Sequence, residues 1–347
     1  MKKVIILSLV LSIFCLSFSI IVSLAEPIKM SEQQIEQSAA PSVSPVPSPS
    51  TSPEAEYVYE DDGISVRVYN GENITVMSMA QYLTGVIAAE MPAVFGIEAL
   101  RAQAVAARTV TLYHMLCYQC EAHPDADVCT DSTCCQAWVS DMQLRDNWDG
   151  DYDTYIAKIL EAVHSTDGEC LVYNGEPIQA VFHSSSADMT AESGEVWANS
   201  LPYLVSVVSP ETAETVPNYV SSVTVSLSDF KQTVVTFYPD AVFTTDTGTW
   251  ITDITYTKSG RIGTVKLGGV TVTGPILRNI FGLRSTAASI DMGDKNVVFT
   301  TTGYGHGVGM SQYGANAFAM QAKSYRDILN WYYTGVRLTH AKDLIKS

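Results

Sequence analysis

The composition of the segment from Glu26 to about Glu56 sets where the folded part of this chain can begin. Its residues are mainly Ser, Pro, Thr, Gln and Glu, with APSVSPVPSPSTSPE at its centre. Such a composition cannot bury enough apolar surface to offset the entropy lost on ordering, so residues 26–56 are predicted to form an extended linker. The folded domain is therefore expected to cover residues 57–347, and no internal repeat subdivides it.

An uncharged run from Val4 to Ala25 follows Lys2 and Lys3 at the N-terminus. Because a bilayer span needs about 20 apolar residues, residues 1–25 are predicted to be a membrane anchor. A cleaved signal segment is the alternative, since Leu24-Ala25 is a tolerable cleavage context. The lysines before the run and the acidic residues after it place the rest of the chain outside the cytoplasm.

The charge balance excludes some classes of partner. The formal net charge is −17, although 46% of the residues are hydrophobic, as in a packed globular protein. Nucleic acids and anionic membrane surfaces select basic patches, so neither is expected as the main partner. A neutral ligand, or one bound through a few local arginines, fits this composition better.

Helical and hairpin patterns alternate along the folded part, which indicates an α+β fold with mostly antiparallel hairpins. Ser78 with Gln81 predicts a helix start, and Pro92 predicts that this helix ends at Glu90. Further helices are expected over residues 97–116, 151–166 and 324–334, and from residues 275 and 315. Turns are expected at Asn70-Gly71, Asn174-Gly175, Ser259-Gly260 and Gly268-Gly269, the last two within a β region over residues 221–274.

Glu90 continues the apolar stripe of its helix, so its carboxyl group should be desolvated. Desolvation raises the pKa of a carboxyl group, as a general acid working near neutral pH requires. A structural ion pair with Arg101 or Arg108, which lie seven residues apart on one face of the next helix, explains Glu90 equally well.

Two polar segments follow a strand end and a run of glycines. His183 and Ser184 to Ser186 leave a strand without a GxSxG elbow, so they are expected either to bind a hydroxyl-rich ligand or to cap the next helix. Glycines alternate from Gly303 to Gly309, which predicts an extended strand with one bare face. The other face would carry Tyr304 and His306, followed by Ser311, Gln312 and Tyr313 at a helix start.

Cysteines cluster in CEAHPDADVCTDSTCCQAW, residues 120–138. Outside the cytoplasm disulfides are the usual state, and six cysteines lie beyond the apolar run. The loop nevertheless contains a set sufficient for tetrahedral Zn(II): His123, Cys129, Cys134 and Cys135. A closed site of this kind would be structural, and the participation of Cys117 and Cys120 stays open.

Several long motifs together resemble the SpoIID/LytB family over nearly all of the chain from about residue 57. They are YLTGVIAAEMPAVFGIEALRAQAVAARTVTL, CQAW, AVFHSSSADMTAESGEVW, LPYLVSVVSP, LRSTAASI and GYGHGVGMSQYGANAFA. Two positions depart from the family pattern. Ala187-Asp188 stand where Gly-Gly is frequent, and Cys134 stands where some relatives have histidine. The second departure leaves the fourth zinc ligand ambiguous, with His123, Cys129 and Cys135 as the first choice and Cys134 as the alternate.

The resemblance implies a lytic transglycosylase, a glycan lyase that cleaves peptidoglycan strands between N-acetylmuramic acid and N-acetylglucosamine and leaves 1,6-anhydromuramyl ends. It favours strands without stem peptides. Glu90 matches the catalytic glutamate, and no cofactor is needed for the chemistry. The substrate-binding positions that it implies are Arg101, Arg108, His183, Ser184, Ser185, Ser186, Tyr304, His306, Ser311, Gln312 and Tyr313, with Tyr304 as a sugar-stacking surface.

The resemblance also implies a cellular setting: engulfment during sporulation, on the mother-cell membrane and facing the septal space. The expected partners are glycan strands, the SpoIIP amidase/endopeptidase and the SpoIIM membrane protein. Two rival functions remain. One is a non-catalytic, glycan-binding amidase enhancer of the LytB kind, and the other is a zinc-dependent peptidase or amidase, which the lack of an HExxH motif makes the weaker rival.

Overall fold

The computed structural model describes residues 58–118 and 122–345. The chain divides into two units, Met1–Glu56 and Tyr57–Ser347, and all described residues belong to the second. The expected anchor (residues 1–25) and linker (residues 26–56) lie outside the described residues. Among the helices of the described ranges, none combines the length and apolarity needed to cross a bilayer.

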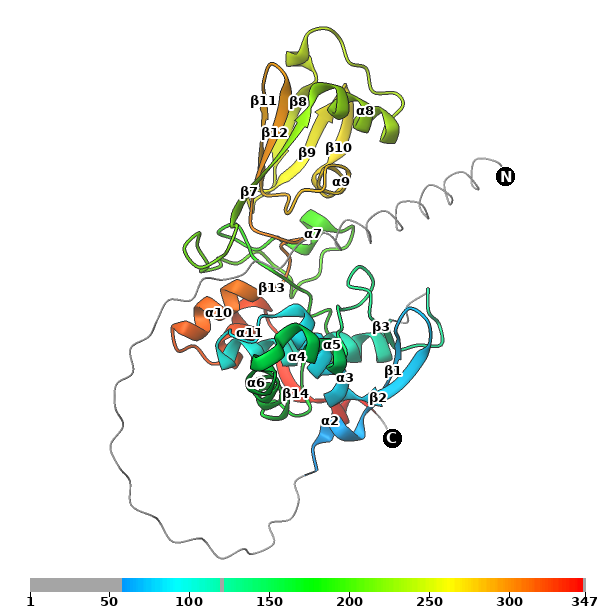
Figure 1. Cartoon of the computed structure of the whole chain (residues 1–347), viewed down its shortest axis with the longest axis vertical. Coiled ribbons are helices and arrows are strands. Elements are labelled where there is room, and N and C mark those ends of the chain that lie inside the picture. Colours follow the sequence, from blue (N-terminus) through cyan, green and yellow to red (C-terminus); the bar gives the residue numbers. More distant parts are fainter. Residues whose placement is uncertain (1–57, 119–121, 346–347) are drawn as a thin grey trace, which may run out of the picture. The chain divides into compact units, whose positions relative to one another are not determined.

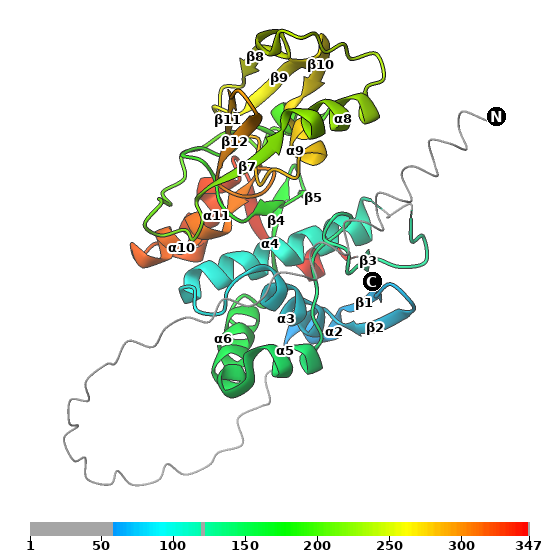
Figure 2. The same cartoon turned by 45° about the horizontal axis from the view of Figure 1, so that its top comes forward.

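Helix α4 (Ile97–Leu116) forms the centre of a first hydrophobic core (Figure 2). Its many buried alanines let neighbouring elements approach the helix axis closely. The elements packed against it are α3 (Met79–Glu90), α6 (Tyr152–His164), β4 (Glu169–Tyr173), α10 (Gln312–Met320) and α11 (Tyr325–Tyr332). The boundaries predicted for α3 and α4 are confirmed.

Two small sheets contribute to this first core. In one, β1 (Ser65–Tyr69) pairs antiparallel with β2 (Ile74–Ser78) and parallel with β3 (Val128–Cys129). In the other, β4 pairs with β5 (Glu176–Pro177) and with β14 (Arg337–His340). The turn between β4 and β5 is Asn174-Gly175 with φ of 52° and 90°, which confirms the predicted two-residue hairpin.

A second hydrophobic core lies between two antiparallel sheets and two helices (Figure 1). The sheets are β7 (Val220–Ser226) with β11 (Ala288–Met292) and β12 (Asn296–Thr302), and β8 (Ile251–Tyr256) with β9 (Ile262–Leu267) and β10 (Val270–Thr273). Helix α9 (Gly274–Ile280) begins one residue before the predicted start, with Pro275 at its second position instead of its first. The structure is thus mixed α+β with several antiparallel sheets, and the predicted fold class is confirmed at this level.

One prediction for this region is wrong. Residues 221–274 are not all β, because α8 (Leu227–Phe237) follows β7 directly. The β-branched and aromatic residues of LSDFKQTVVTF favour a strand. The Ser226 side chain, however, accepts a hydrogen bond from the N–H of Asp229 and caps a helix, whose Phe230 and Val234 are buried. Capping and burial therefore outweigh the local β propensity.

The glycine-rich segment is also not the extended strand predicted. Gly303, Gly305, Gly307 and Gly309 all have positive φ, between 72° and 109°. The segment lies against the chain's own residues 181–186, and β6 (Phe182–His183) pairs parallel with β13 (Met310–Ser311). A Cβ at Gly309 would lie 2.0 Å from the Val181 carbonyl oxygen, so only glycine fits there.

The remaining helical elements are short. They are α2 (Glu60–Gly63), α5 (Asp141–Trp148), η1 (Asp149–Asp151), α7 (Ser193–Val196), η2 (Thr247–Thr249) and η3 (Ala341–Asp343).

Candidate active site

A pocket of ≈ 360 Å³ lies at the C-terminal end of α3. Four segments that lie far apart in the sequence contribute to this pocket. Glu90 is the one carboxylate among the lining residues. The lining residues are Ala88, Ala89, Glu90, Met91, Pro92, Ala93, Trp148, Ser184, Gln312 and Tyr313.

Local sequence fixes Glu90 at this position. The predicted capping box of Ser78 and Gln81 is present at the start of α3. At the other end Met91 is extended, with φ −132° and ψ 132°, as a residue before proline prefers, and its N–H still donates to the Ile87 carbonyl. Glu90 is therefore the last residue of the helix, and its side chain reaches the pocket.

The Glu90 carboxylate has two hydrogen-bond donors. The backbone N–H of Ala137 donates to Oε1 at 2.9 Å, and the Gln312 side-chain amide donates to Oε2 at 3.4 Å. Burial raises the pKa of Glu90, while these two hydrogen bonds act in the opposite direction. The net effect keeps a proton available closer to neutral pH, as the sequence predicted for a general acid.

The start of α10 brings Gln312 and Tyr313 to the pocket. Ser311 caps the helix by accepting from the N–H of Gly314 and donates its own hydroxyl hydrogen to Glu211 Oε1 at 2.5 Å. The N–H of Tyr313 donates to the Ser184 carbonyl at 3.0 Å. Ser311 is therefore buried, and it positions its two neighbours instead of lining the pocket itself.

His183 and two of the three serines lie beneath the surface. His183 bonds through Nδ1 to the Val308 carbonyl at 3.1 Å and through Nε2 to the Ser186 hydroxyl at 2.7 Å. Burial lowers its pKa well below the usual value, so the imidazole is neutral. Ser185 is buried as well, and only Ser184 of this loop lines the pocket.

Tyr304 and His306 lie outside the pocket-lining set. The Tyr304 ring is 45% exposed and carries the Arg284 guanidinium at 4.3 Å from its centroid. The His306 ring packs between those of His183 and Trp197, at 5.6 and 5.2 Å, and burial lowers its pKa to about 4.

The structure does not bring the two predicted arginines to Glu90. Arg108 is completely buried and forms an ion pair with Asp61 at 2.5 Å. Arg101 pairs with Glu98 at 2.5 Å and Glu161 at 3.1 Å. The predicted ion pair of Glu90 with Arg101 or Arg108 is therefore wrong, because other carboxylates match both charges. Arg108 is also too deeply buried to contact a ligand, whereas substrate contact by Arg101 stays a prediction. The partner of Arg108 lies 47 residues earlier, and no spacing in the sequence signals it.

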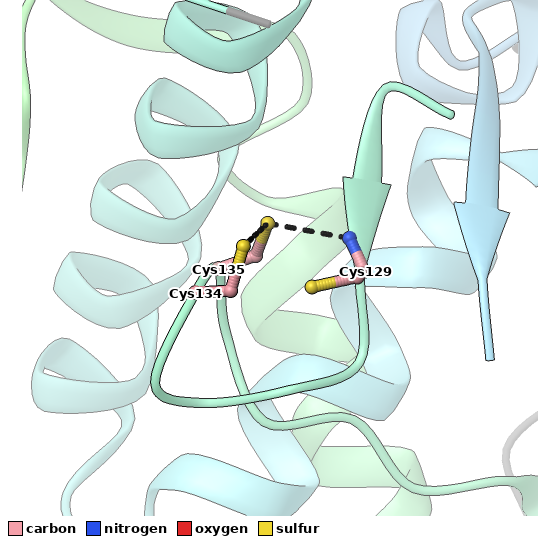
Figure 3. A group of neighbouring side chains, drawn as sticks. All are labelled: Cys129, Cys134 and Cys135. Carbon is pink, nitrogen blue, oxygen red and sulfur yellow. Dashed lines mark hydrogen bonds between the residues drawn. The ribbon is translucent and has the colours of Figure 1, made fainter. Parts of the chain in front are cut away.

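Three cysteines converge where β3 meets the loop that carries Ala137 (Figure 3). Cys129 ends β3, and Cys134 and Cys135 lie on the loop that follows, with all three sulfur atoms within 4.8 Å of one another. A tetrahedral zinc with Zn–S bonds of about 2.3 Å spaces its sulfurs about 3.8 Å apart. The Cys134 and Cys135 sulfurs are 3.8 Å apart, so the thiols fit three positions of such a site.

His123, predicted as a zinc ligand, is not in this group. Its ring stacks on Tyr69 with centroids 4.1 Å apart. Of the two cysteines left open, Cys117 is also outside this group, with its thiol 3.6 Å from a Glu176 carboxylate oxygen, and Cys120 lies outside the described residues. Interaction with Cys135 lowers the pKa of Cys129 to about 6, so one thiolate forms readily in this cluster even before a cation is added.

The cysteine loop leads directly to Glu90. Gln136, next to Cys135, is buried, and its amide donates to the Thr111 hydroxyl at 3.3 Å. Ala137 follows and supplies the hydrogen bond to Glu90. Any contact that holds Cys135 in place therefore also helps to position the Ala137 N–H, one of the two donors to the Glu90 carboxylate.

Sequence reasoning missed two contributors to the pocket. Trp148, the last residue of α5, lines it and offers an apolar ring of the kind that stacks on sugars. The Ala137 N–H is a backbone group, so no residue type signals it. A tryptophan in the DNWDG stretch was the one available signal for Trp148.

Comparison with known proteins bears on this site. A sequence model of the SpoIID family, described as Stage II sporulation protein, matches residues 69–173, which include Glu90 and the three cysteines. Stage II sporulation protein D of Bacillus subtilis (strain 168) is 35% identical over 281 residues, 80% of this chain and 80% of the relative. The protein of that name from Bacillus amyloliquefaciens is 35% identical over 84% of this chain and 83% of its own length.

A more distant relative is the Amidase enhancer of Bacillus subtilis (strain 168). It is 28% identical over 307 residues, which cover 74% of this chain and 40% of the relative.

Proposed function

The chain belongs to the SpoIID family of stage II sporulation proteins, and from this membership we propose that it is a peptidoglycan lytic transglycosylase. The observation that carries the proposal is Glu90, a carboxyl group with a raised pKa in a pocket that has no second carboxylate among its lining residues. Hydrolases of glycosidic bonds generally use two carboxylates. A single one suits a reaction in which the substrate supplies its own nucleophile.

In the proposed reaction, protonated Glu90 donates its proton to the glycosidic oxygen as the bond to muramyl C1 breaks. The muramyl C6 hydroxyl then attacks C1, and the Glu90 carboxylate takes the hydroxyl proton. A 1,6-anhydro ring forms, the leaving sugar keeps the first proton, and Glu90 is protonated again. No water is consumed.

The surrounding side chains have distinct tasks in this scheme. The Ala137 N–H and the Gln312 amide hold the carboxylate in place and stabilise its charged form between the two proton transfers. Trp148 and Tyr313 offer ring faces to sugars, and Ser184 a hydroxyl. A substrate groove along this pocket would continue past Tyr304.

For the three thiols we propose a structural zinc. Cys129, Cys134 and Cys135 would hold it, and the ion would supply a crosslink between β3 and the loop that carries Ala137. A structural zinc has four protein ligands, so this proposal requires a fourth ligand beside the three thiols. With the coordination shell closed in that way the ion would activate no water and would have no part in the proton transfers.

The cellular setting remains a proposal too. Residues 1–25 would anchor the protein in the mother-cell membrane, with the catalytic domain facing the septal space and residues 26–56 as the linker. Cleavage of strands without stem peptides would follow the action of the SpoIIP amidase/endopeptidase, beside the SpoIIM membrane protein.

A second candidate function is a non-catalytic amidase enhancer, because a relative of that name shares 28% of aligned residues with this chain. It would bind glycan in the same pocket and stimulate a separate amidase. In that case the Glu90 carboxyl would contribute to binding alone.

The experiment is mass spectrometry of glycan strands without stem peptides after incubation with the full chain. We expect anhydromuramyl ends from the unmodified protein and from Glu72→Gln, whose side chain lies on an exposed hairpin loop, but none from Glu90→Gln. Glycan binding without new ends in all three samples, with amidase stimulation that survives Glu90→Gln, would instead establish the enhancer.

A further inference from the structure

Three arginines on or next to elements of the second hydrophobic core have no role in the proposed reaction. Arg261 precedes β9, Arg278 lies on α9, and Arg284 follows that helix. Within residues 58–118 and 122–345, none of the three forms an ion pair with a carboxylate. The arginines of these ranges that do are Arg67, Arg101, Arg108, Arg145 and Arg326.

Arg261 is the most deeply placed of the three. It is 2% exposed, its Nε has no hydrogen-bond partner in the described part of the chain, and one terminal nitrogen donates to the Met189 carbonyl at 3.3 Å. Gly307 packs on the guanidinium, since a Cβ there would lie 2.3 Å from Cζ. Burial lowers the pKa of Arg261 to about 10, a sign that the fold holds this cation at a cost.

Two carboxylates act on Arg261 from further away, but each is engaged elsewhere. Glu195 accepts from the Ser259 hydroxyl at 2.5 Å, and Glu211 accepts from the Ser186 N–H and the Ser311 hydroxyl at 2.6 and 2.5 Å. They therefore moderate the positive potential of the cluster without contacting it.

Arg278 lies within electrostatic range of Arg261, and Arg284 contacts Arg278. The Nε of Arg284 is buried without a partner among the described residues, and its guanidinium covers the Tyr304 ring. Its backbone carbonyl accepts from the Gly305 N–H at 3.0 Å and from Arg278 Nε at 3.3 Å. Burial lowers the pKa of Arg278 as well. Arg261 and Arg278 act electrostatically on each other and on His306, so these two guanidinium groups lie near one histidine ring, and Arg284 adjoins them through its contact with Arg278.

Continuous contacts join this spot to the pocket. Tyr304 exchanges two backbone hydrogen bonds with Ser185, at 3.0 and 2.8 Å. Ser184, the residue before Ser185, lines the pocket, and its carbonyl accepts a hydrogen bond from the N–H of Tyr313. The charge of Arg284 also acts on Tyr313, so the cluster lies within electrostatic range of the pocket wall.

Unpaired, partly buried cations are costly, and this chain has a large surplus of carboxylates that could have paired them. Their persistence beside a ligand pocket indicates an anion brought by the ligand, and arginine is the side chain best suited to grip a carboxylate. We propose that Arg261, Arg278 and Arg284 bind the lactyl carboxylate of a muramic acid residue next to the cleavage point.

This inference rests on the proposed function for the identity of the ligand. A stem peptide is attached to the lactyl group by an amide bond, which removes this carboxylate. The cluster would thus be the element that distinguishes strands without stem peptides from strands that carry them. Carboxylates of the stem peptide itself are the other source of the same chemistry.

The test measures dissociation constants for the full chain carrying Glu90→Gln, so that the ligand is not consumed. The probes are muro-oligosaccharides without stem peptides, the same oligosaccharides with the lactyl carboxyl converted to a methylamide, and peptide-bearing oligosaccharides. We expect the free carboxylate to bind about 10- to 100-fold more tightly than the amide, the range of a charged hydrogen bond. Adding Arg284→Gln should abolish that preference, whereas Arg284→Lys should keep part of it.

Arg337→Gln is the matched control. Arg337 is exposed on β14. Its substitution also removes one positive charge, but away from the three arginines, so the preference for the free carboxylate should be unchanged. Thermal unfolding of each variant shows whether the fold is intact, and Arg278→Gln provides a second test if Arg284→Gln is unstable. Equal binding of carboxylate and amide by the parent, or a preference that survives both substitutions, overturns the proposal. Tightest binding of the peptide-bearing strand, lost in Arg284→Gln, overturns the lactyl assignment.

Failure of the proposed function gives a different result. If the unmodified protein makes no anhydromuramyl ends but the carboxylate preference depends on Arg284, the arginine site stands and the transglycosylase does not. If ends are formed from free and amidated strands equally well, the transglycosylase stands and the arginine site does not.

Discussion

The backbone N–H of Ala137 lies 2.9 Å from Oε1 of Glu90 and donates a hydrogen bond to it. This bond joins the helix that carries the proposed catalytic acid to the loop that carries the three thiols. A change at either end is therefore expected to reach the other.

Titration of Glu90 should destabilise the fold as pH rises. Its pKa is raised by burial, so the folded state keeps a proton that the unfolded chain has already lost. Stability should fall from the unfolded pKa of about 4.3 up to the folded pKa and then stay level. Glu90→Gln removes this titration, so its stability relative to the parent should increase across that window in urea unfolding at a series of pH values. Parallel curves for the two proteins would contradict the prediction. In the parent, kcat/KM should fall as pH rises through the same folded pKa.

Arg108 and Asp61 should behave as a buried ion pair with no role in substrate binding. Arg108→Met leaves the Asp61 carboxylate buried without its partner and should lower the free energy of unfolding by about 3–5 kcal/mol. Arg108→Met with Asp61→Leu should recover much of the loss, because both charges are then gone. Arg145→Gln, which breaks an exposed pair, should leave stability unchanged. A Arg108→Met protein that is fully stable but binds glycan poorly would restore the substrate-binding interpretation.

Gly309→Ala should disrupt the contact between residues 181–186 and the glycine segment. Its φ is 72°, and the added Cβ would meet the Val181 carbonyl oxygen. Gly175 has a similar φ of 90° but open space around it, so Gly175→Ala should cost only the backbone term of about 1–2 kcal/mol. Urea unfolding of both variants separates steric overlap from backbone strain. Similar losses in the two would show that the close contact is not tight.

Removal of the proposed zinc should loosen the loop that carries Ala137. We expect about one zinc per chain by elemental analysis, lost in Cys129→Ser and Cys135→Ser and retained in Cys170→Ser, whose thiol is buried against the Thr339 carbonyl instead. A chelator should lower the melting temperature and the activity together. Loss of activity at an unchanged melting temperature would point to a catalytic metal and favour the peptidase rival.

Local signals predicted the parts of the fold that depend on neighbours in sequence. Ser78 with Gln81 and the proline at position 92 determine both ends of α3, because capping and the restriction before proline act within a few residues. The same signals placed Glu90 correctly at a helix end. The Asn174-Gly175 hairpin follows from the positive φ of both residues.

Predictions failed where distant residues decide the outcome. The alternation of glycines suggested a strand, but their positive φ values are imposed by close approach to residues about 120 positions earlier. Charge patterning could not reveal which carboxylate meets Arg108, nor that Arg261 meets none within the described residues. These features depend on contacts between segments far apart in the sequence, which no single segment specifies.

The pocket's dependence on segments far apart in sequence has a consequence for how the protein matures. Residues 88–93 and Trp148 emerge early in synthesis, whereas Gln312 and Tyr313 emerge more than 160 residues after Trp148. Contacts of such long range form slowly and late. A nascent or truncated chain that ends before residue 303 would therefore carry Glu90 without Gln312 and Tyr313, the part of the pocket lining that α10 supplies. If the protein has the proposed function, cleavage of peptidoglycan would begin only once export of the chain is nearly complete.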